Sequence, residues 1–263
     1  MKRLLGAALL VLAALPALPA LPARAAGDCI LDNCADQRPA EGAGSAPAAA
    51  PSPASRSWFG PSRSWFAPRG GGGAPSANFD FYVLALSWSP SFCATGAGRS
   101  PAQCAPGANP GFVTHGLWPQ YQSGYPSQCA GNPYLPYSAL SGLGDLYPDS
   151  GLARHEWRQH GLCSGKSPSG YFADVRTARD AVAVPAALKA PPEDRRFSPL
   201  DIQRAFIDAN PRLRPGMMAV VCRRGVFQEA RFCLSRDLRD FVACPEVARQ
   251  GCYSQSIVVP ASQ

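Results

Sequence analysis

The nine residues from His155 to Cys163, HEWRQHGLC, carry two of the three histidines in the chain. If this stretch is helical, at about 100° per residue, His155, Gln159, Glu156 and His160 lie within an arc of about 140°. Glu156 and His160 are four residues apart, so their side chains can touch. A carboxylate beside an imidazole raises the basicity of the ring and fixes its orientation. The stretch therefore predicts a helix face that can act as a general base.

The third histidine, His115, lies in the sequence THGLWP at the end of an expected strand, and Trp118 follows three residues later. A general base needs a general acid across the substrate. Two histidines on separate elements, with an aromatic side chain nearby, suit in-line displacement at a phosphodiester. Taken singly, each histidine could equally be a core or surface residue. The placement of all three in two such motifs favours the catalytic interpretation.

A zinc site is the competing interpretation of the second motif. The zinc motif H-E-x-x-H spaces its histidines four apart on one helix face. His155 and His160 are five apart and point about 140° away from each other. No further histidine follows them, and we expect Cys163 in a disulfide rather than in a metal site. We therefore expect no metal and no cofactor.

Residues 1–25 have the pattern of a secretory signal peptide. A basic start precedes an apolar run at residues 4–15, and Ala23–Ala25 offers a small-x-small cleavage site. The run is too short to span a bilayer, so we expect cleavage and no stable membrane insertion; the alternative is an uncleaved anchor. Ten cysteines, an even number, suit an oxidising compartment. We expect a periplasmic or secreted protein.

The charge of the chain is mildly basic. The formal net charge is +7, and removing Lys2, Arg3 and Arg24 with the signal peptide leaves 22 basic against 18 acidic residues, or +4. This balance weakly favours a polyanionic partner, and ordinary surface charge is the alternative. The sequence has no run of Lys and Arg typical of binding to duplex nucleic acid.

Residues 26–77 are predicted to be a disordered linker rich in Ala, Pro, Gly and Ser, because such a composition cannot bury enough apolar surface to fold. It contains a tandem repeat at 55–68, SRSWFGP then SRSWFAP, which either docks on another surface or is a duplicated low-complexity segment. Cys29 and Cys34 are close enough to pair, but the sequence leaves this open. The folded domain is expected at 78–263.

The domain mixes helix and strand patterns in an order that predicts an α+β fold with a largely antiparallel sheet. The helix at 198–211 has Ser198 at its N-cap and Pro199 at its first position. Helices are expected at 138–150, 151–165, 169–184 and 198–211, and strands at 79–88, 111–119, 216–224, 226–235 and 254–261.

These motifs resemble a known family. The sequences HGLWP (115–119) and HEWRQHGLC (155–163) are similar to the two active-site segments of the ribonuclease T2 family. Residues 81–93 resemble its first core strand, residues 229–238 resemble a late strand of its bacterial members, and the match spans roughly 78–258. The resemblance implies the T2 fold, a central largely antiparallel sheet flanked by helices. It also implies metal-independent cleavage of single-stranded RNA through 2′,3′-cyclic phosphates.

The resemblance further implies roles at the matching positions. His160 would be the general base on the ribose 2′-hydroxyl, and His115 the general acid at the departing 5′-oxygen. His155 would contact the phosphate, and Glu156 would help to stabilise the charged transition state. The substrate would be RNA because the 2′-hydroxyl that attacks the phosphate is absent from DNA.

One position departs from the family pattern. Gln159 stands where the family usually carries a lysine, immediately before the last histidine of the second motif. A neutral amide can donate a hydrogen bond but cannot neutralise charge, and losing one such contact commonly costs on the order of 2.7–4 kcal/mol of transition-state stabilisation. Arg158, the nearest cation, projects about 100° away. We expect Gln159 to contact the phosphate in a slower enzyme; the alternative is a non-catalytic RNA-binding protein.

Base recognition in such enzymes relies on stacking. Trp118 matches the family motif, and Tyr121 and Tyr125 are candidates by proximity, with core packing as the alternative for all three. A stacked base contributes ~1–3 kcal/mol whatever its identity, so we expect low base specificity. Gln120 stands where some relatives have an acidic residue, which leaves a purine preference open.

The cysteine positions also match the family arrangement, and the match implies four disulfides. Each would stabilise the fold mainly by restricting the unfolded chain. We expect a monomer whose partner is a single-stranded RNA substrate. The implied pairs are Cys93–Cys104, Cys129–Cys163, Cys222–Cys252 and Cys233–Cys244.

Overall fold

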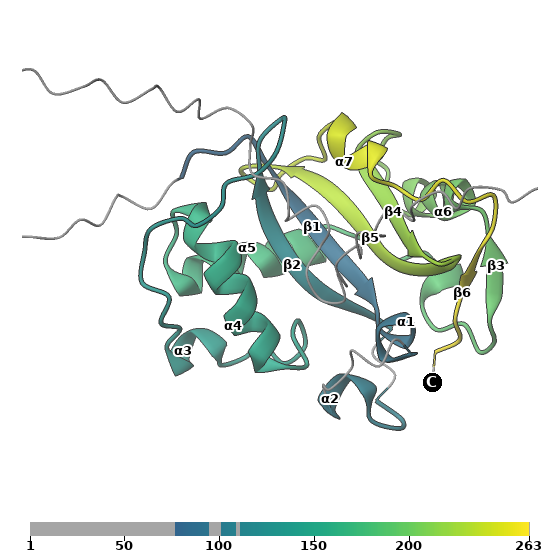
Figure 1. The fold of residues 1–263 in the computed structure, drawn as a ribbon, viewed down its shortest axis with the longest axis horizontal. Coiled ribbons are helices and arrows are strands. Elements are labelled where there is room, and N and C mark those ends of the chain that lie inside the picture. Colours follow the sequence, from purple (N-terminus) through teal and green to yellow (C-terminus); the bar gives the residue numbers. More distant parts are fainter. Residues whose placement is uncertain (1–76, 95–100, 109–110, 263) are drawn as a thin grey trace, which may run out of the picture.

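The computed structural model of the protein describes residues 77–94, 101–108 and 111–262. The expected signal peptide, the linker up to residue 76, the Trp-Phe repeat and the pair Cys29 and Cys34 lie outside these residues. Within them, a sheet is flanked by helices (Figure 1), which confirms the expected α+β fold.

The strands of the described residues form one sheet that is largely antiparallel. They are Phe81–Trp88 (β1), Phe112–Gln120 (β2), Arg195–Phe197 (β3), Met218–Arg223 (β4), Val226–Ser235 (β5) and Ile257–Val259 (β6). β1 lies between β2 and β5, and β5 also pairs with β4. β6 joins β5 through one parallel pair, Val226 with Val258, and β3 pairs with β6. The first histidine motif, at residue 115, therefore lies on a strand at one edge of the sheet.

The strand β1 is buried on both faces, which explains its nearly continuous apolar sequence. Successive strand residues point to opposite faces. Leu86 and Trp88 pack into the larger core, whereas Val83 and Ala85 face a smaller apolar cluster that includes Trp118. The sheet thus has a core on one side and, on the other, a cluster that reaches the first motif.

The helices of the described residues lie at several places around the sheet (Figure 1). They are Ser89–Ala94 (α1), Pro101–Cys104 (α2), Tyr137–Leu140 (α3), Ser150–Gln159 (α4), Pro168–Asp180 (α5), Pro199–Ala209 (α6) and Pro245–Arg249 (α7), with 3-10 helices at Gly161–Ser164 and Ala186–Leu188. In Figure 1, α3, α4 and α5 lie on the side of β2, and α6 lies across the sheet near β4. In the part of the chain described, no helix combines the length and apolar character needed to cross a membrane.

Capping residues explain where two of the helices begin. The hydroxyl of Ser167 accepts a hydrogen bond from the backbone N–H of Gly170 at the start of α5. Ser198 and Asp201 form a reciprocal capping box at the start of α6, and Pro199 occupies the first turn. The predicted N-cap at Ser198 is confirmed.

The prediction of a helix at 138–150 is wrong. α3 ends at Leu140, and Gly142 then adopts a φ of 80°, a left-handed conformation that favours glycine. Leu143, Leu146 and Tyr147 are nevertheless buried, so the apolar pattern of this segment reflects packing of turns against the core. β3 escapes sequence-based prediction because two of its three residues are exposed arginines.

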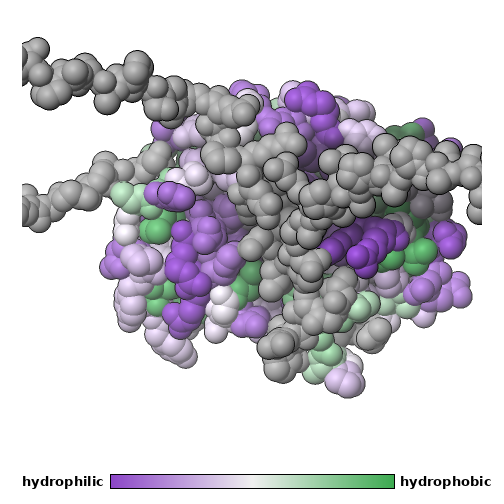
Figure 2. Space-filling model, viewed as in Figure 1, coloured by the Kyte–Doolittle hydropathy of each residue, from purple (hydrophilic) through white to green (hydrophobic). Residues whose placement is uncertain are grey.

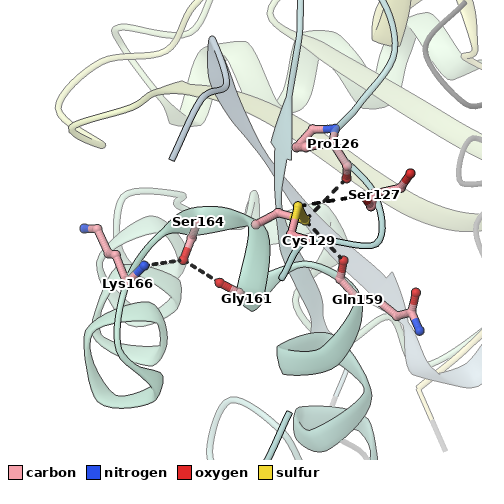
Figure 3. The surroundings of a disulfide bond; sticks show 8 residues. Pro126, Ser127, Cys129, Gln159, Gly161, Ser164 and Lys166 are labelled. Carbon is pink, nitrogen blue, oxygen red and sulfur yellow. Dashed lines mark hydrogen bonds between the residues drawn. A yellow bond between two sulfur atoms is a disulfide. The ribbon is translucent and has the colours of Figure 1, made fainter. Parts of the chain in front are cut away.

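All four expected disulfides are present, Cys93–Cys104, Cys129–Cys163, Cys222–Cys252 and Cys233–Cys244. The pair Cys129–Cys163 joins the loop after β2 to the 3-10 helix that follows α4, and Figure 3 shows its surroundings. This disulfide therefore ties together the two segments that carry the histidine motifs.

Candidate active site

His115 occupies a β-bulge in β2. The register with β1 pairs Ala85 with Gly116 but Leu86 with Thr114, which leaves His115 as the extra residue. A bulge bends its strand and changes the direction of the extra side chain, and bulges are common beside active sites. The half-buried imidazole of His115 is consequently directed by the bulge as well as by the strand.

The second motif lies on the inner face of α4 and on the residue that follows this helix. Glu156 is 1% exposed, His160 is 5% exposed and His155 is half-buried. His160 leaves the helical conformation, with φ −125° and ψ −40°, yet its N–H still donates to the carbonyl oxygen of Glu156. The helix expected at 151–165 therefore ends at Gln159 and continues as a 3-10 helix, but the contact between positions four apart is kept.

The carboxylate of Glu156 brings the two motifs together. Its Oε1 lies 3.8 Å from Nε2 of His115, and its Oε2 lies 4.0 Å from Nε2 of His160. The indole Nε1–H of Trp118 donates to the same Oε2 over 2.9 Å. The rings of His115 and His160 both lie near Trp118, with centroids 5.2 Å and 5.4 Å from the indole. The two imidazoles thus come from different elements and face one buried carboxylate.

Gly116 leaves the space in which this carboxylate lies. A Cβ atom at position 116 would overlap Oε2 of Glu156 and Nε1 of Trp118. The glycine of the HGLWP motif is therefore required because any side chain would occupy the space of Glu156, and not because of an unusual backbone angle.

The site also contains two charged residues that the sequence-based analysis did not select, Glu229 and Arg231 on β5. Nδ1 of His115 lies 2.7 Å from Oε2 of Glu229, and the hydroxyl of Ser87 donates to that oxygen over 3.1 Å. Nε of Arg231 donates to Oε1 of Glu229 over 2.7 Å, and the guanidinium lies 5.4 Å from the centre of the Trp118 ring. Both side chains are at most 8% exposed.

A signal for this pair was available in the sequence. Glu229 and Arg231 alternate with apolar residues in EARFCLS and therefore point to one face of a strand. Charged side chains are rarely buried unless they are paired. The pattern could not identify His115 as the partner of Glu229, because the two residues are far apart along the chain.

The surroundings of His115 hold its imidazole in the charged form. Burial by itself lowers the pKa of His115, but the charge and hydrogen bond of Glu229, together with the charge of Glu156, outweigh it and raise the pKa to about 9. Burial raises the pKa of Glu229 in turn, but Arg231 and His115 reverse this effect and lower it to about 2. Glu229 therefore stays ionised and His115 stays protonated at neutral pH.

His160 is held in the opposite state. Burial, followed by the charges of His115 and His155, lowers the pKa of His160 to about 3. The sequence-based expectation that Glu156 makes this imidazole more basic is therefore wrong in direction, because desolvation of the ring dominates. At neutral pH, one imidazole of the site carries a proton and the other can accept one.

Gln159 lies at the rim of the site. Arg154, Arg158 and Gln159 are exposed, and the outer side of α4 is hydrophilic in Figure 2. The carbonyl oxygen of Gln159 lies near the Cys129–Cys163 disulfide, and Figure 3 shows its amide directed away from these sulfur atoms. Within the described residues, no cluster of three or more His, Cys, Asp or Glu side chains could hold a metal ion.

Comparison with known proteins identifies the family. The sequence model of the ribonuclease T2 family matches residues 79–244, which include both histidine motifs and Glu229. The chain belongs to the ribonuclease T2 family. It is a T2-type endoribonuclease, as the resemblance in the sequence implied.

Relatives and solved structures agree with this assignment. The T2 ribonuclease is 36% identical to a ribonuclease of Aeromonas hydrophila over 65% of this chain and 79% of that protein. It is also 36% identical to a probable ribonuclease of Haemophilus influenzae, over 41% of this chain and 45% of that protein. A mutant of RNase MC1 in complex with 5′-UMP has the same fold, with a TM-score of 0.56 and 21% identity over 68% of this chain and 98% of that one. RNase NT in complex with 5′-AMP also has this fold, with a TM-score of 0.53 and 22% identity over 70% of this chain and 99% of that one.

The exposures of the three aromatic candidates bear on base stacking in this T2 ribonuclease. Trp118 is 2% exposed and Tyr125 is 8% exposed, so neither ring offers an open face to a base in this structure. Tyr121 is half-buried and packs against the core. Stacking at these positions stays a prediction, and the observed contacts of Trp118 are those of a residue that orients Glu156.

Proposed function

We propose that this T2 ribonuclease cleaves single-stranded RNA by transphosphorylation to 2′,3′-cyclic phosphate ends and then hydrolyses them, without a metal or cofactor. The observation that carries the proposal is the placement of two imidazoles, from separate elements, 3.8 Å and 4.0 Å from one buried carboxylate. Their environments shift the two rings in opposite directions. The pKa of His160 is about 3 and that of His115 is about 9, so at neutral pH one ring accepts a proton and the other donates one.

The reaction then proceeds in two steps. In the first, Nε2 of His160 removes the proton of the ribose 2′-hydroxyl, the 2′-oxygen attacks phosphorus, and His115 protonates the 5′-oxygen as the P–O5′ bond breaks. In the second, water replaces the departed alcohol, and the two histidines exchange roles as acid and base. Each ring regains its starting state after the second step, so no other proton carrier is needed.

The other polar residues of the motif serve the phosphate and the developing charge. His155 and Gln159 lie next to the catalytic pair on the more open side of α4, where they contact the phosphate. Glu156 holds both imidazoles at a defined distance and helps to stabilise the crowded transition state. Because stacking accepts any base, the enzyme has low base specificity, and it acts as a monomer on RNA.

A non-catalytic RNA-binding protein is the alternative, and the observation that favours it is Gln159 in place of the family lysine. Incubation of the oxidised protein with single-stranded RNA in EDTA separates the two. Cyclic-phosphate ends, detected by mass spectrometry and lost in His115→Ala and His160→Ala, support the proposal. Binding without cleavage supports the alternative, and loss of activity in EDTA would instead require a metal.

We also propose that the protein is periplasmic or secreted. Four disulfides are stable in an oxidising compartment, and the first residues have the pattern of a signal peptide. Cell fractionation followed by mass measurement of the mature protein tests this. Export with cleavage near residue 25 is expected, and an uncleaved protein in the reducing cytoplasm would contradict it.

A further inference from the structure

We propose that Glu229, held by Arg231, is a positioning residue that fixes the ring of His115 and keeps its transferable proton on Nε2. This inference rests on the proposed function, since it assigns the control of the general acid. It concerns residues of β5 that lie outside both histidine motifs.

The first argument is that the two nitrogens of His115 have different partners. Nδ1 lies 2.7 Å from Oε2 of Glu229, within the distance of a charge-assisted hydrogen bond. Nε2 faces the other way and lies 3.8 Å from Oε1 of Glu156. A carboxylate that accepts from one imidazole nitrogen sets the orientation of the ring and leaves the other nitrogen to exchange protons. The Nε2 proton is therefore the one delivered to the leaving oxygen.

The second argument is that the sheet makes room for this contact. Glu229 on β5 pairs with Ser87 on β1, and β1 separates β5 from β2. Strands lie about 4.8 Å apart, so a contact between β2 and β5 must pass over the residue between them. Ser87 has a small side chain, and it also donates to Glu229. The bulge at His115 supplies the remaining adjustment of direction.

The third argument is that Arg231 keeps Glu229 ionised. A carboxylate this deeply buried without a cation would favour the protonated form, which carries no charge to stabilise the imidazolium of His115 and accepts a weaker hydrogen bond. Arg231 occupies Oε1, while His115 and Ser87 occupy Oε2. The guanidinium also lies over the ring of Trp118, whose indole binds Glu156. One connected set of contacts thus orients both carboxylates of the site.

The test uses the full-length oxidised enzyme and two substrates that differ only in their leaving group. A dinucleoside monophosphate such as UpA has an alcohol leaving group and needs a general acid, whereas uridine 3′-(4-nitrophenyl phosphate) has a phenolate and does not. In Glu229→Gln, kcat for UpA should fall about 100-fold, in line with the usual contribution of acid catalysis, while kcat for the nitrophenyl ester falls by less than about tenfold. KM for both substrates should stay within about threefold, because Glu229 lies on the Nδ1 side of His115, opposite the nitrogen that faces the reaction in this proposal.

Three comparisons make the result specific. His115→Ala should show the same selective loss, because it removes the acid itself. Glu193→Gln removes an exposed carboxylate and should behave as the wild type. Should Glu229→Gln fail to fold, Glu229→Asp keeps the charge, shortens the reach and is measured in the same way.

The outcomes separate this inference from the proposed function. Equal losses on the two substrates would show a structural role for Glu229, and no loss would show that His115 needs no positioning partner; either result overturns the inference. If the wild-type enzyme cleaves neither substrate, the proposed function itself fails.

Discussion

The indole N–H of Trp118 donates a 2.9 Å hydrogen bond to Oε2 of Glu156, the carboxylate that both His115 and His160 face. Because Glu156 is almost fully buried, its position depends on such donors rather than on water. The tryptophan of the HGLWP motif, whose ring contacts both imidazoles, therefore acts on the chemistry through the carboxylate.

Trp118→Phe should keep the aromatic packing and remove this donor. A buried acceptor that loses its partner typically costs about 1–3 kcal/mol, so kcat should fall by roughly tenfold to a hundredfold with a matching loss of stability. RNA cleavage and urea unfolding measure the two effects. Trp157→Phe is the matched control, because Trp157 donates to the carbonyl oxygen of Asn132 and lies outside the carboxylate site. It should lose stability but keep most of its activity; equal losses of activity in both variants would contradict the role of Trp118.

Gly116→Ala should displace Glu156, because the added methyl group would overlap its carboxylate. Loss of the preorganised site should reduce kcat by about 100-fold or more, and overpacking should lower the free energy of unfolding by about 1–3 kcal/mol. Gly144→Ala is the control, since a Cβ there meets nothing within 4 Å. An active Gly116→Ala enzyme would show that the carboxylate position is not critical.

The pH dependence of kcat/KM, which reports the ionisations of the free enzyme, should be a broad plateau. His160 must be neutral and His115 protonated, and their pKa values lie at about 3 and about 9. Activity should therefore fall on the acid side only as His160 becomes protonated, and on the alkaline side only as His115 loses its proton. Initial rates at substrate concentrations well below KM, measured across this range, give kcat/KM. A narrow bell with both limbs near the ordinary histidine pKa of about 6.5 would contradict these shifts.

Removal of His160 should reduce the acid sensitivity of the fold. Since the folded pKa of His160 is lowered to about 3, the unfolded chain binds a proton that the folded chain does not as pH falls below about 6.5. Stability is therefore lost as pH decreases through this window, and His160→Gln removes that loss. Urea unfolding of both proteins between neutral and mildly acidic pH tests this. Parallel pH dependences would show that the imidazole is protonated in the folded protein.

Gln159→Lys should raise turnover. A cation beside His160 would neutralise charge on the phosphorane. One such contact typically stabilises the transition state enough to raise kcat by roughly tenfold to a hundredfold, so we expect a gain of this size. Gln255→Lys adds the same charge at another exposed position and should leave kcat unchanged. If Gln159→Lys gives no gain, another cation already serves the phosphate.

Much of the fold followed from local patterns. The apolar run of β1, the N-cap at Ser198 and the cysteine spacing each carry their information within a short stretch of chain or within the family pattern. The segment at 138–150 misled the analysis because its apolar residues are buried by tertiary packing although its glycines interrupt the helix. A pattern of apolar residues alone does not distinguish a helix from a series of turns packed against the core.

By itself the sequence determined which residue types could perform the chemistry, namely three histidines and Glu156 in two motifs, and it determined the family. The tertiary structure decided the protonation state of each of these groups at neutral pH. Burial reverses the expected basicity of His160, and a bulge together with a partner more than a hundred residues away sets the charge of His115. The physical reason is that a pKa depends on desolvation and on charges nearby in space, and both arise only when distant strands pack together.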